Sequence, residues 1–196
     1  MTQNDTVTKI LDAAEELFAE QGFAETSLRK ITAKAGVNLA AVNYHFGSKK
    51  ALIQAVFARF LGPFYKLVES SLDYSERQNP DLILSIEDIL KFVARAMANV
   101  TEGDRNRLAI FMRLLGLAYN QGQGHLRKFL QSEYRDIFKR IMALIAVATP
   151  ELDPVERFWR FHFMLGSAAF TLSSMTHLRA IVEHDFDTKC TEEEVV

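Results

Sequence analysis

The chain of 196 residues lacks the features of secreted, membrane and metal-cluster proteins. Its only cysteine, Cys190, lies near the C-terminal end, so it has neither a disulfide framework nor a cysteine metal cluster. The first residues are polar and acidic rather than an apolar leader. No apolar run approaches the roughly 18 residues of a membrane span. We therefore expect a protein of the reducing cytoplasm that does not cross a membrane.

The sequence also lacks the patterns typical of catalytic and metal sites. No two histidines stand at metal-ligand spacing, and no glycine-rich loop is suited to binding phosphate. The histidines are His45, His125, His162, His177 and His184. With 48% hydrophobic residues, the chain can bury a core of one or two small domains. We predict no enzyme activity, no cofactor and no metal.

One segment contains no acidic residue. The formal net charge of the chain is −2, but residues 26–68 contain seven Lys or Arg and no Asp or Glu, which gives +7. Residues 1–25 carry −5 and residues 69–196 carry −4. A basic segment between acidic ones is typical of a phosphate-binding surface. The alternative is a solvated basic face without a partner.

No strand pattern is stronger than the helical spacing of apolar residues, so we predict an all-α fold. Its N-terminal three-helix domain, residues 1–47, is joined to a helical bundle, residues 48–196, by a long helix that Ser48 is expected to cap. A bend is expected at Gly62–Pro63, because proline removes a backbone donor. Helices are predicted over residues 6–21, 27–35, 38–46, 86–97, 108–119, 126–147 and 155–182, with a loop at 75–80 and breaks at 103, 122–124 and 150–154.

Residues Gly36–Lys50 are typical of the turn and second helix of a helix-turn-helix. Two helices of this region begin with cations, Arg29 and Lys30 in one and Lys49 and Lys50 in the other. Cations at a helix N-terminus are unfavourable by a few tenths of a kcal/mol. An external phosphate removes this conflict, because it pairs with the cations and accepts hydrogen bonds from free amides. The pattern therefore predicts a duplex DNA partner.

The short helix that begins after its cap, Asn38, is the candidate recognition helix. Its Val42 and Phe46 can face the core, while Leu39, Ala40, Asn43 and Tyr44 remain available outside. Ala40 and Ala41 permit close approach, and Asn43 can make paired hydrogen bonds to adenine. Thr26 is expected to cap the preceding helix and to reach phosphate. The predicted DNA-binding residues are Thr26, Ser27, Lys30, Asn38, Leu39, Ala40, Ala41, Asn43, Tyr44, His45 and Lys49. Each alone is better explained as a cap, a surface aromatic or a packed ring, so the prediction rests on their combination.

Residues 6–53 resemble the DNA-binding domain of TetR-family repressors. The matching positions are Phe18, Gly22, Phe23, Thr26, Ile31, Ala35, Gly36, Val37, Tyr44, Phe46, Lys49 and Leu52. The resemblance implies a homodimer on a palindromic operator and an all-helical C-terminal domain that binds a ligand. A helical adaptor that binds protein is another possible class, but it leaves the acid-free segment unexplained.

A narrower resemblance, to the fatty-acid-responsive PsrA subfamily of these repressors, extends through most of the chain. It is carried by residues 37–57, 110–118, 124–128 and 162–166. It implies repression of fatty-acid metabolism genes and release by a long-chain fatty acid or its acyl-coenzyme A (acyl-CoA). The alternative is a TetR-family repressor of an efflux or other catabolic operon that responds to a different apolar ligand.

Large, adaptable side chains in the C-terminal half are candidates for an apolar ligand pocket, with an ordinary bundle core as the alternative. Arg113 lies inside an apolar run, where an unpaired charge is costly to bury. It ranks first as a contact for a ligand carboxylate or phosphate, and His162 ranks second, although an internal salt bridge also explains Arg113. The predicted ligand-binding residues are Phe92, Phe111, Met112, Arg113, Phe129, Phe138, Met142, Trp159, His162 and Phe163.

Gly166, Ala169 and Ser173 share one face of the last predicted helix and let another helix approach closely. This small-residue face predicts either a dimer seam or tight packing inside the monomer. Residues 191–194 have the form of a capping box and Val195–Val196 begins an apolar run. Relatives usually continue into another helix there, so we expect the last helix to be missing from this chain and the dimer to be weaker.

Overall fold

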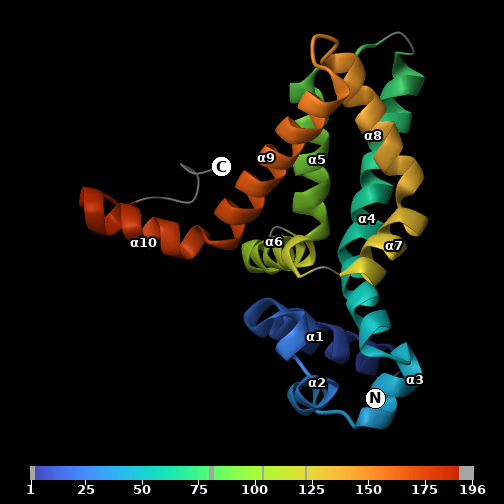
Figure 1. Ribbon diagram of the computed structural model, residues 1–196, viewed down its shortest axis with the longest axis vertical. Coiled ribbons are helices and arrows are strands. Elements are labelled where there is room, and N and C mark those ends of the chain that lie inside the picture. Colours follow the sequence, from blue (N-terminus) through green and yellow to red (C-terminus); the bar gives the residue numbers. More distant parts are fainter. Residues whose placement is uncertain (1–2, 80–81, 103, 122, 190–196) are drawn as a thin grey trace.

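The computed structural model describes residues 3–79, 82–102, 104–121 and 123–189. Within these residues the chain forms ten α-helices and no strand, which confirms the all-α prediction. Figure 1 shows α1, α2 and α3 grouped at one end of the molecule, with α4 leading from them into a larger helical bundle. The helices are α1 (Gln3–Glu25), α2 (Leu28–Ala35), α3 (Leu39–Phe46), α4 (Lys49–Gln78), α5 (Ile86–Val100), α6 (Arg105–Asn120), α7 (Gly124–Glu133), α8 (Arg135–Ala148), α9 (Pro154–Ser173) and α10 (Met175–Phe186).

The N-terminal helices share a core that includes the first turns of α4. Phe18 and Phe23 pack together with ring centroids 5.3 Å apart, and Phe23 lies 6.3 Å from Phe57 of α4. Phe57 and Leu52 of α4 are fully buried. The division between residues 47 and 48 stays a prediction, and α4 begins inside the N-terminal core.

Side-chain caps fix where the short helices begin. Asn38 accepts a hydrogen bond from the amide of Ala41, and Ser48 accepts one from the amide of Ala51, so both predicted caps are confirmed. The cap of α2 is Ser27, which accepts from the amide of Lys30. The prediction that Thr26 caps this helix was wrong.

Helix α4 is longer than predicted. It continues through the Gly62–Pro63 pair, where a bend was expected, and ends at Gln78, so the first four residues of the predicted loop at 75–80 are helical. The guanidinium of Arg140 on α8 pairs with Asp73 at 2.6 Å and with Glu76 at 2.9 Å. These ion pairs stabilise the last turns of α4, and they cannot be read from the local sequence.

Two predicted long helices are each divided in the structure. The segment 126–147 is interrupted at Tyr134, and the segment 155–182 is interrupted at Ser174. Both residues leave the helical conformation, with ψ of 12° and 9°. Apolar spacing continues across each break, so periodicity did not reveal them. The expected break at Gly103 and the capping pattern at 191–194 lie outside the described residues.

Among the described residues, α4 alone is long and apolar enough to pass a length-and-composition test for a membrane span. One such helix is weak evidence for a span, because the core helix of a soluble protein passes the same test and because Arg59 and Lys66 interrupt the apolar residues of α4. Nine α4 side chains are buried within the protein, which is also typical of a core helix. They are Leu52, Ile53, Val56, Phe57, Phe60, Leu61, Phe64, Val68 and Leu72. The cytoplasmic location stays a prediction.

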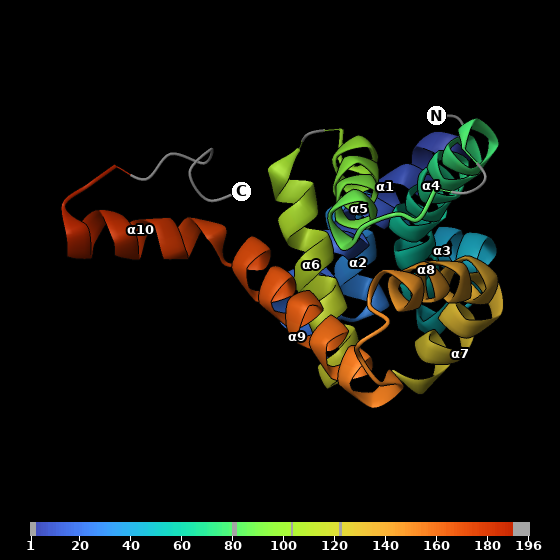
Figure 2. The ribbon, with the colours of Figure 1, turned by 90° about the horizontal axis from the view of Figure 1, so that it is seen from above.

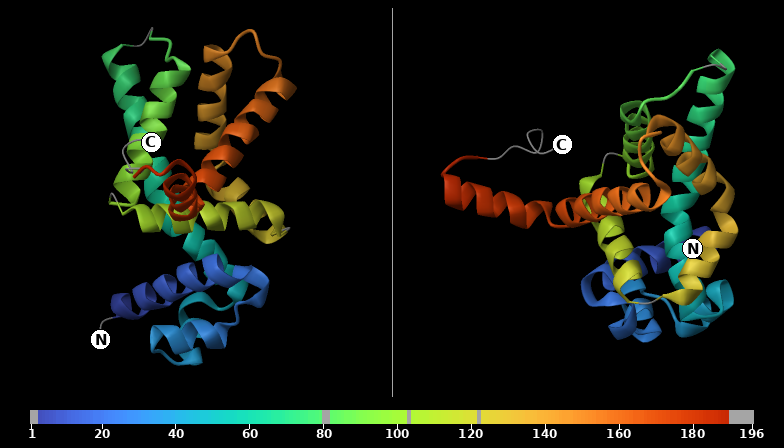
Figure 3. Two further views of the ribbon diagram at one scale, coloured as in Figure 1. Left: turned by 90° about the vertical axis from the view of Figure 1, so that its left-hand side faces the viewer. Right: turned by 45° about the horizontal axis from the view of Figure 1, so that its top comes forward.

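Helix α6 lies crosswise between the N-terminal helices and the upper bundle (Figures 1 and 3). It packs against α1 on one side and against α9 on the other. Above it, the α4–α5 pair and the α8–α9 pair stand side by side (Figure 3). Figure 2 shows α10 projecting away from the body of the molecule. Helix α6 is therefore a second link, beside α4, between the N-terminal helices and the bundle.

An ionic cluster at the edge of the core joins α1 to α4. The Arg59 guanidinium donates to the carboxylates of Asp12 at 2.6 Å and Glu15 at 2.9 Å. Glu15 is only 5% exposed, and its burial raises its pKa to about 7, although the nearby positive charge of Arg59 opposes the rise. Arg107 of α6 also lowers this pKa, and Asp12 raises it. Glu15 therefore titrates near neutral pH.

The raised pKa predicts a specific dependence of stability on pH. Because folded Glu15 binds its proton more tightly than unfolded Glu15, the free energy of unfolding falls as pH rises from about 4.5 to above 7. The shift corresponds to about 3 kcal/mol, and Glu15→Gln should remove this fall. Urea unfolding at pH 5, 6, 7 and 8 measures it. The control is Glu20→Gln, at an exposed position of the same helix. A difference between wild type and Glu15→Gln that does not vary with pH would contradict the prediction.

Candidate nucleic-acid and effector sites

Helix α3 presents the face expected of a recognition helix. Val42 is fully buried, whereas Ala40, Asn43 and Tyr44 are exposed, and Tyr44 has 77% of its surface free. Of the other predicted α3 contacts, Leu39 is exposed and Ala41 and His45 are half-buried. The side chain of Asn38 is engaged in capping, and that of Ser27 caps α2. The predicted orientation of α3 is confirmed, and the contacts with DNA stay predictions.

Thr26 has a structural role instead of the predicted contact with phosphate. Its side chain is fully buried, and its hydroxyl is close to two carbonyl oxygens, those of Gly22 at 2.8 Å and Leu17 at 3.0 Å. These contacts close the turn between α1 and α2. The prediction that Thr26 reaches DNA was wrong, because its fully buried side chain stabilises the fold of the domain instead of facing the DNA.

The structure separates the cations of the acid-free segment into two groups. Lys34 pairs with Glu16 at 2.6 Å, and Arg59 pairs with Asp12 and Glu15, so α1 neutralises two of the seven. Four of the other five are Arg29, Lys30, Lys49 and Lys50, at the starts of α2 and α4. The positive charge therefore concentrates at two helix N-termini that flank α3.

The four cations at these helix starts differ in their partners. The Lys30 ammonium donates to Gln21 Oε1 at 2.7 Å, and that of Lys49 donates to the carbonyl of Ala24 at 3.1 Å. Arg29 and Lys50 are exposed and form no side-chain hydrogen bond or ion pair within the described part of the chain. Arg29 and Lys50 are absent from the predicted set of DNA contacts. Their positions at the starts of two helices could have led to their inclusion. Unlike Lys30 and Lys49, they have no hydrogen-bond or carboxylate partner among the described residues.

A groove of about 400 Å³ runs between α6 and α9. Its walls bring together Arg113 and His162, the two predicted head-group contacts, with the predicted Met112. Arg113 is exposed and forms no ion pair with any other described residue, so its charge faces solvent. The Nδ1–H of His162 donates a hydrogen bond to the carbonyl oxygen of Phe158, with Nδ1 and the oxygen 2.7 Å apart. We call this hollow the α6–α9 groove; it is lined by Met112, Arg113, Leu115, Gly116, Leu117, Tyr119, Asn120, His162, Leu165, Gly166, Ala169, Phe170 and Ser173.

The other predicted ligand-binding residues do not line this groove. Phe111 is buried against α4, with its ring 4.8 Å from that of Phe60. Phe92, Phe129 and Met142 are partly buried and pack against the core. Phe138, Trp159 and Phe163 are exposed. The ligand role of these seven residues stays a prediction that the groove does not support.

A second hollow of about 280 Å³ lies between α5, α8 and α9, and none of the predicted ligand residues line it. Its walls are mainly aliphatic, with Glu151 and two arginines, Arg157 and Arg160, also present. Arg157 is tied to the end of α8, because its guanidinium donates to the carbonyls of Thr149 and Leu152 at 3.0 and 2.6 Å. Arg160 pairs with Glu156 at 2.6 Å. Both cations therefore already have partners within the protein.

Helix α9 carries an exposed apolar face. Five large side chains on this helix are each more than half exposed, and Trp159 stacks on Phe163 with ring centroids 6.0 Å apart. We define the α9 apolar face as Val155, Phe158, Trp159, Phe163 and Phe170. Exposed patches of this kind mark interaction sites.

Gly166 lies within the α9 apolar face, since the spacing of residues 159, 163, 166 and 170 places them on one side of a helix. A Cβ at Gly166 would meet no other atom within 4 Å. Tight packing inside the monomer was the alternative to a dimer seam. At Gly166 the monomer shows no such packing. Ala169 and Ser173 are half-buried beside α6 in the α6–α9 groove.

Together, a capped recognition helix, cationic helix starts and an all-helical second domain define a helix-turn-helix DNA-binding regulator. Two family models agree with this architecture. Residues 10–56 match the model described as bacterial regulatory proteins, tetR family, and residues 91–196 match the tetracyclin repressor-like, C-terminal domain. The chain belongs to the TetR family, whose matched relatives are transcriptional regulators and not enzymes.

Similar proteins include regulators from Pseudomonas putida and Bacillus subtilis. The HTH-type transcriptional regulator SrpR of Pseudomonas putida is 32% identical over 65% of this chain and 57% of its own length. The probable HTH-type transcriptional regulator YttP of Bacillus subtilis is 32% identical over 44% of this chain and 43% of its own length. This chain thus spans about half the length of these two curated relatives.

Solved structures share the fold at lower sequence identity. The fatty acid degradation regulator FadR from Bacillus halodurans matches with a TM-score of 0.59 and 18% identity, over 94% of this chain and 88% of that one. The TetR family regulator PfmR from Thermus thermophilus matches with a TM-score of 0.52 and 19% identity, over 83% and 84% of the two chains. These matches show that the whole described arrangement, from α1 to the upper bundle, is a known TetR fold.

The DNA-binding face predicts different effects for two substitutions. Lys50→Ala should weaken binding to operator and unrelated duplexes alike, and should reduce the dependence of log Kd on log salt by about 1, because one phosphate contact is lost. Asn43→Ala should cost about 1–3 kcal/mol on the operator only, because a base contact is lost. Fluorescence anisotropy with a labelled palindromic promoter fragment from the protein's own locus measures both.

The matched control for these variants is Lys66→Ala. Lys66 is an exposed cation of the same acid-free segment, 16 residues or roughly 24 Å farther along α4 than Lys50. Its removal should leave the affinity and the salt dependence unchanged. An equal loss for Lys66→Ala and Lys50→Ala would show that general charge, rather than the helix starts, attracts DNA.

Proposed function

We propose that this protein is a homodimeric repressor of fatty-acid metabolism genes, released from a palindromic operator by a long-chain fatty acid or acyl-CoA. The observation that carries the effector class is the α6–α9 groove, where an exposed, unpaired Arg113 lies beside apolar walls and His162. An apolar tail with an anionic head group complements this combination. A protein of the same fold, FadR from Bacillus halodurans, is described as a fatty acid degradation regulator.

The hollow between α5, α8 and α9 supports a second candidate function. Its walls are mainly aliphatic and its two arginines already have partners, so it suits a ligand without a charged head group. A repressor of an efflux or other catabolic operon that responds to an uncharged apolar ligand would use such a hollow. Release by a fatty acid or acyl-CoA distinguishes the first candidate from this one.

The homodimer is supported by the α9 apolar face. A second copy of this chain would cover its exposed aromatic rings, and Gly166 would let the two helices approach closely. Helix α10 extends this surface, because Ile181 and Phe186 are 53% and 72% exposed on a helix that projects from the body (Figure 2). Burial of these apolar side chains between two copies would contribute favourably to the free energy of dimerisation, because it removes apolar surface from water.

The effector proposal predicts release of the operator. In the anisotropy assay, oleate or oleoyl-CoA should release the wild-type protein. Arg113→Ala should weaken the affinity for the ligand about tenfold or more, since a hydrogen bond to a charged group is worth roughly 1.5–3 kcal/mol. Arg95→Ala, at an exposed arginine of α5 outside the groove, is the control. Unchanged ligand affinity in Arg113→Ala would refute this head-group contact.

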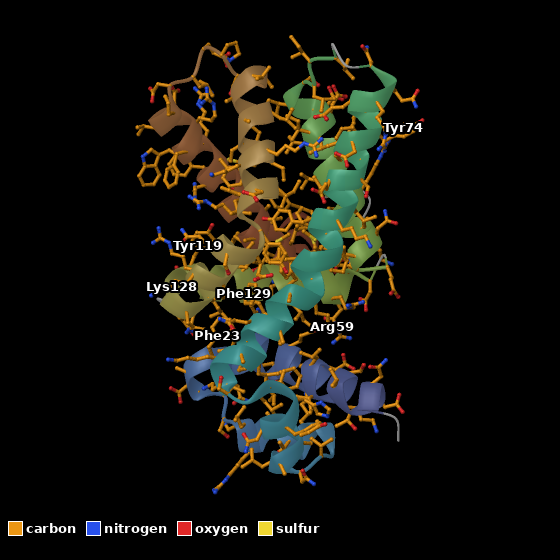
Figure 4. The ribbon with its side chains drawn as sticks, turned by 90° about the vertical axis from the view of Figure 1, so that its right-hand side faces the viewer. Phe23, Arg59, Tyr74, Tyr119, Lys128 and Phe129 are labelled. Carbon is orange, nitrogen blue, oxygen red and sulfur yellow. The ribbon has the colours of Figure 1, made fainter. Side chains whose placement is uncertain are left out.

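The dimer proposal predicts a change of mass in solution. Phe163→Glu places a charge in the α9 apolar face and should convert the dimer to a monomer, measured by size exclusion with light scattering. Tyr74→Glu is the control, at a position 62% exposed on α4 and far from α9 in Figure 4. A wild-type protein that is strictly monomeric would refute the dimer.

Gly166→Ala tests close approach of the two copies. In an isolated helix this change is favourable by up to about 1 kcal/mol, and the monomer has room for the methyl group. A weaker dimer with an unimpaired monomer fold would therefore locate the partner helix at Gly166. A dimer of unchanged strength would place the contact elsewhere on the face.

A further inference from the structure

One side chain from the C-terminal domain holds the end of α1. Gln121 directly follows α6, and its Oε1 accepts a hydrogen bond from the backbone amide of Phe23 at 3.2 Å. Gly22, just before Phe23, interrupts α1 with φ 81° and ψ 166°, a conformation that is essentially restricted to glycine. A break in α1 therefore coincides with a partner from α6.

The contact between Gln121 and Gly22 is close. The Gln121 Nε2 atom lies 2.8 Å from the position that a Cβ at Gly22 would occupy. Any side chain at residue 22 would displace the glutamine as well as strain the backbone. The absence of a side chain at Gly22 thus allows Gln121 to reach the amide of Phe23.

The turn that Gln121 holds supports the DNA-binding helices. Thr26 directly precedes Ser27, the cap of α2, and its hydroxyl contacts the carbonyl of Gly22. The Lys49 ammonium, at the start of α4, donates to the carbonyl of Ala24. The ring of Phe23 contacts those of Phe18 on α1 and Phe57 on α4. A displacement of this turn would therefore move the starts of both α2 and α4, which flank α3.

The same end of α6 belongs to the α6–α9 groove. Tyr119 and Asn120 line the groove, and Gln121 is the next residue. At the start of α7, the carbonyl of His125 accepts a hydrogen bond from the Gln54 side chain of α4 at 3.3 Å. Figure 4 shows Phe23 at the level where the N-terminal helices meet the upper bundle, with Tyr119 above it. The residue that bonds to the turn, Gln121, thus directly follows a groove-lining residue along the chain.

We propose that Gln121 is a positioning residue that links occupancy of the α6–α9 groove to the DNA-binding helices. Its hydrogen bond to Phe23 holds the turn at residues 22–26 in the arrangement that binds the operator. A ligand that moves the end of α6 withdraws this bond. The proposal rests on the proposed function, because it takes the groove as the effector site.

The test compares Gln121→Leu, which removes the acceptor at similar size, with Gln121→Glu, which keeps an accepting oxygen. Gln121→Leu should raise the operator Kd about two- to tenfold, the value of one hydrogen bond, without altering the salt dependence or the base preference. The ratio of operator Kd with oleoyl-CoA to that without it should fall by a similar factor. Gln121→Glu should restore both quantities, and Gln131→Leu, at an exposed glutamine of α7, should change neither.

A second measurement does not require a ligand. Hydrogen exchange at the Phe23 amide of the DNA-free protein should be about two- to tenfold faster in Gln121→Leu and near wild type in Gln121→Glu, because one hydrogen bond protects this amide. The proposal would be overturned if Gln121→Leu matched the wild type in Phe23 exchange, operator Kd and release ratio. It would also be overturned if Gln121→Leu lowered the melting temperature without changing the operator Kd. If neither oleate nor oleoyl-CoA releases the wild type from the operator, the proposed effector is refuted. The operator Kd and the exchange rate of the Phe23 amide would then still decide the role of Gln121.

Discussion

The closed turn between α1 and α2 is the constraint on which the DNA-binding domain depends. Gly22 ends the regular part of α1 because it can adopt φ 81°, and the buried hydroxyl of Thr26 fixes the turn by its contacts with the carbonyls of Leu17 and Gly22. The turn directs α2 back across α1, with Phe23 inserted into the shared core. Because these contacts are buried, a small change at this turn is transmitted to α3 rather than absorbed.

Local patterns in the sequence predicted the DNA-binding half of the molecule well. The caps at Asn38 and Ser48, the stop at Gly36 and the exposed face of α3 depend on neighbouring residues, and the structure confirms them. The role of Thr26 could not be predicted in this way, since its acceptors lie four and nine residues back along the chain. The bonds of Arg140 to α4 and of Gln121 to Phe23 join residues 67 and 98 apart, beyond the reach of any local pattern.

The charges of the acid-free segment serve two purposes that the net charge hides. Lys34 and Arg59 face the acidic side of α1, where ion pairs hold α2 and α4 against it. Such pairs at or near the surface are worth little in energy but fix orientation. Arg29 and Lys50 lack carboxylate partners among the described residues, so phosphate would be their natural partner. A positive segment can therefore build the domain and bind DNA at the same time.

The α6–α9 groove and the α9 apolar face share a boundary on α9. Gly166 and Phe170 line the groove, yet helical spacing places both on the side that carries Trp159 and Phe163. A second copy packed on this side would lie beside the mouth of the groove and shield its apolar wall from water. An anionic head group would then remain near Arg113, on the α6 wall. Binding of the proposed ligand and contact between two copies would then be coupled, because both would depend on the position of α9 relative to α6.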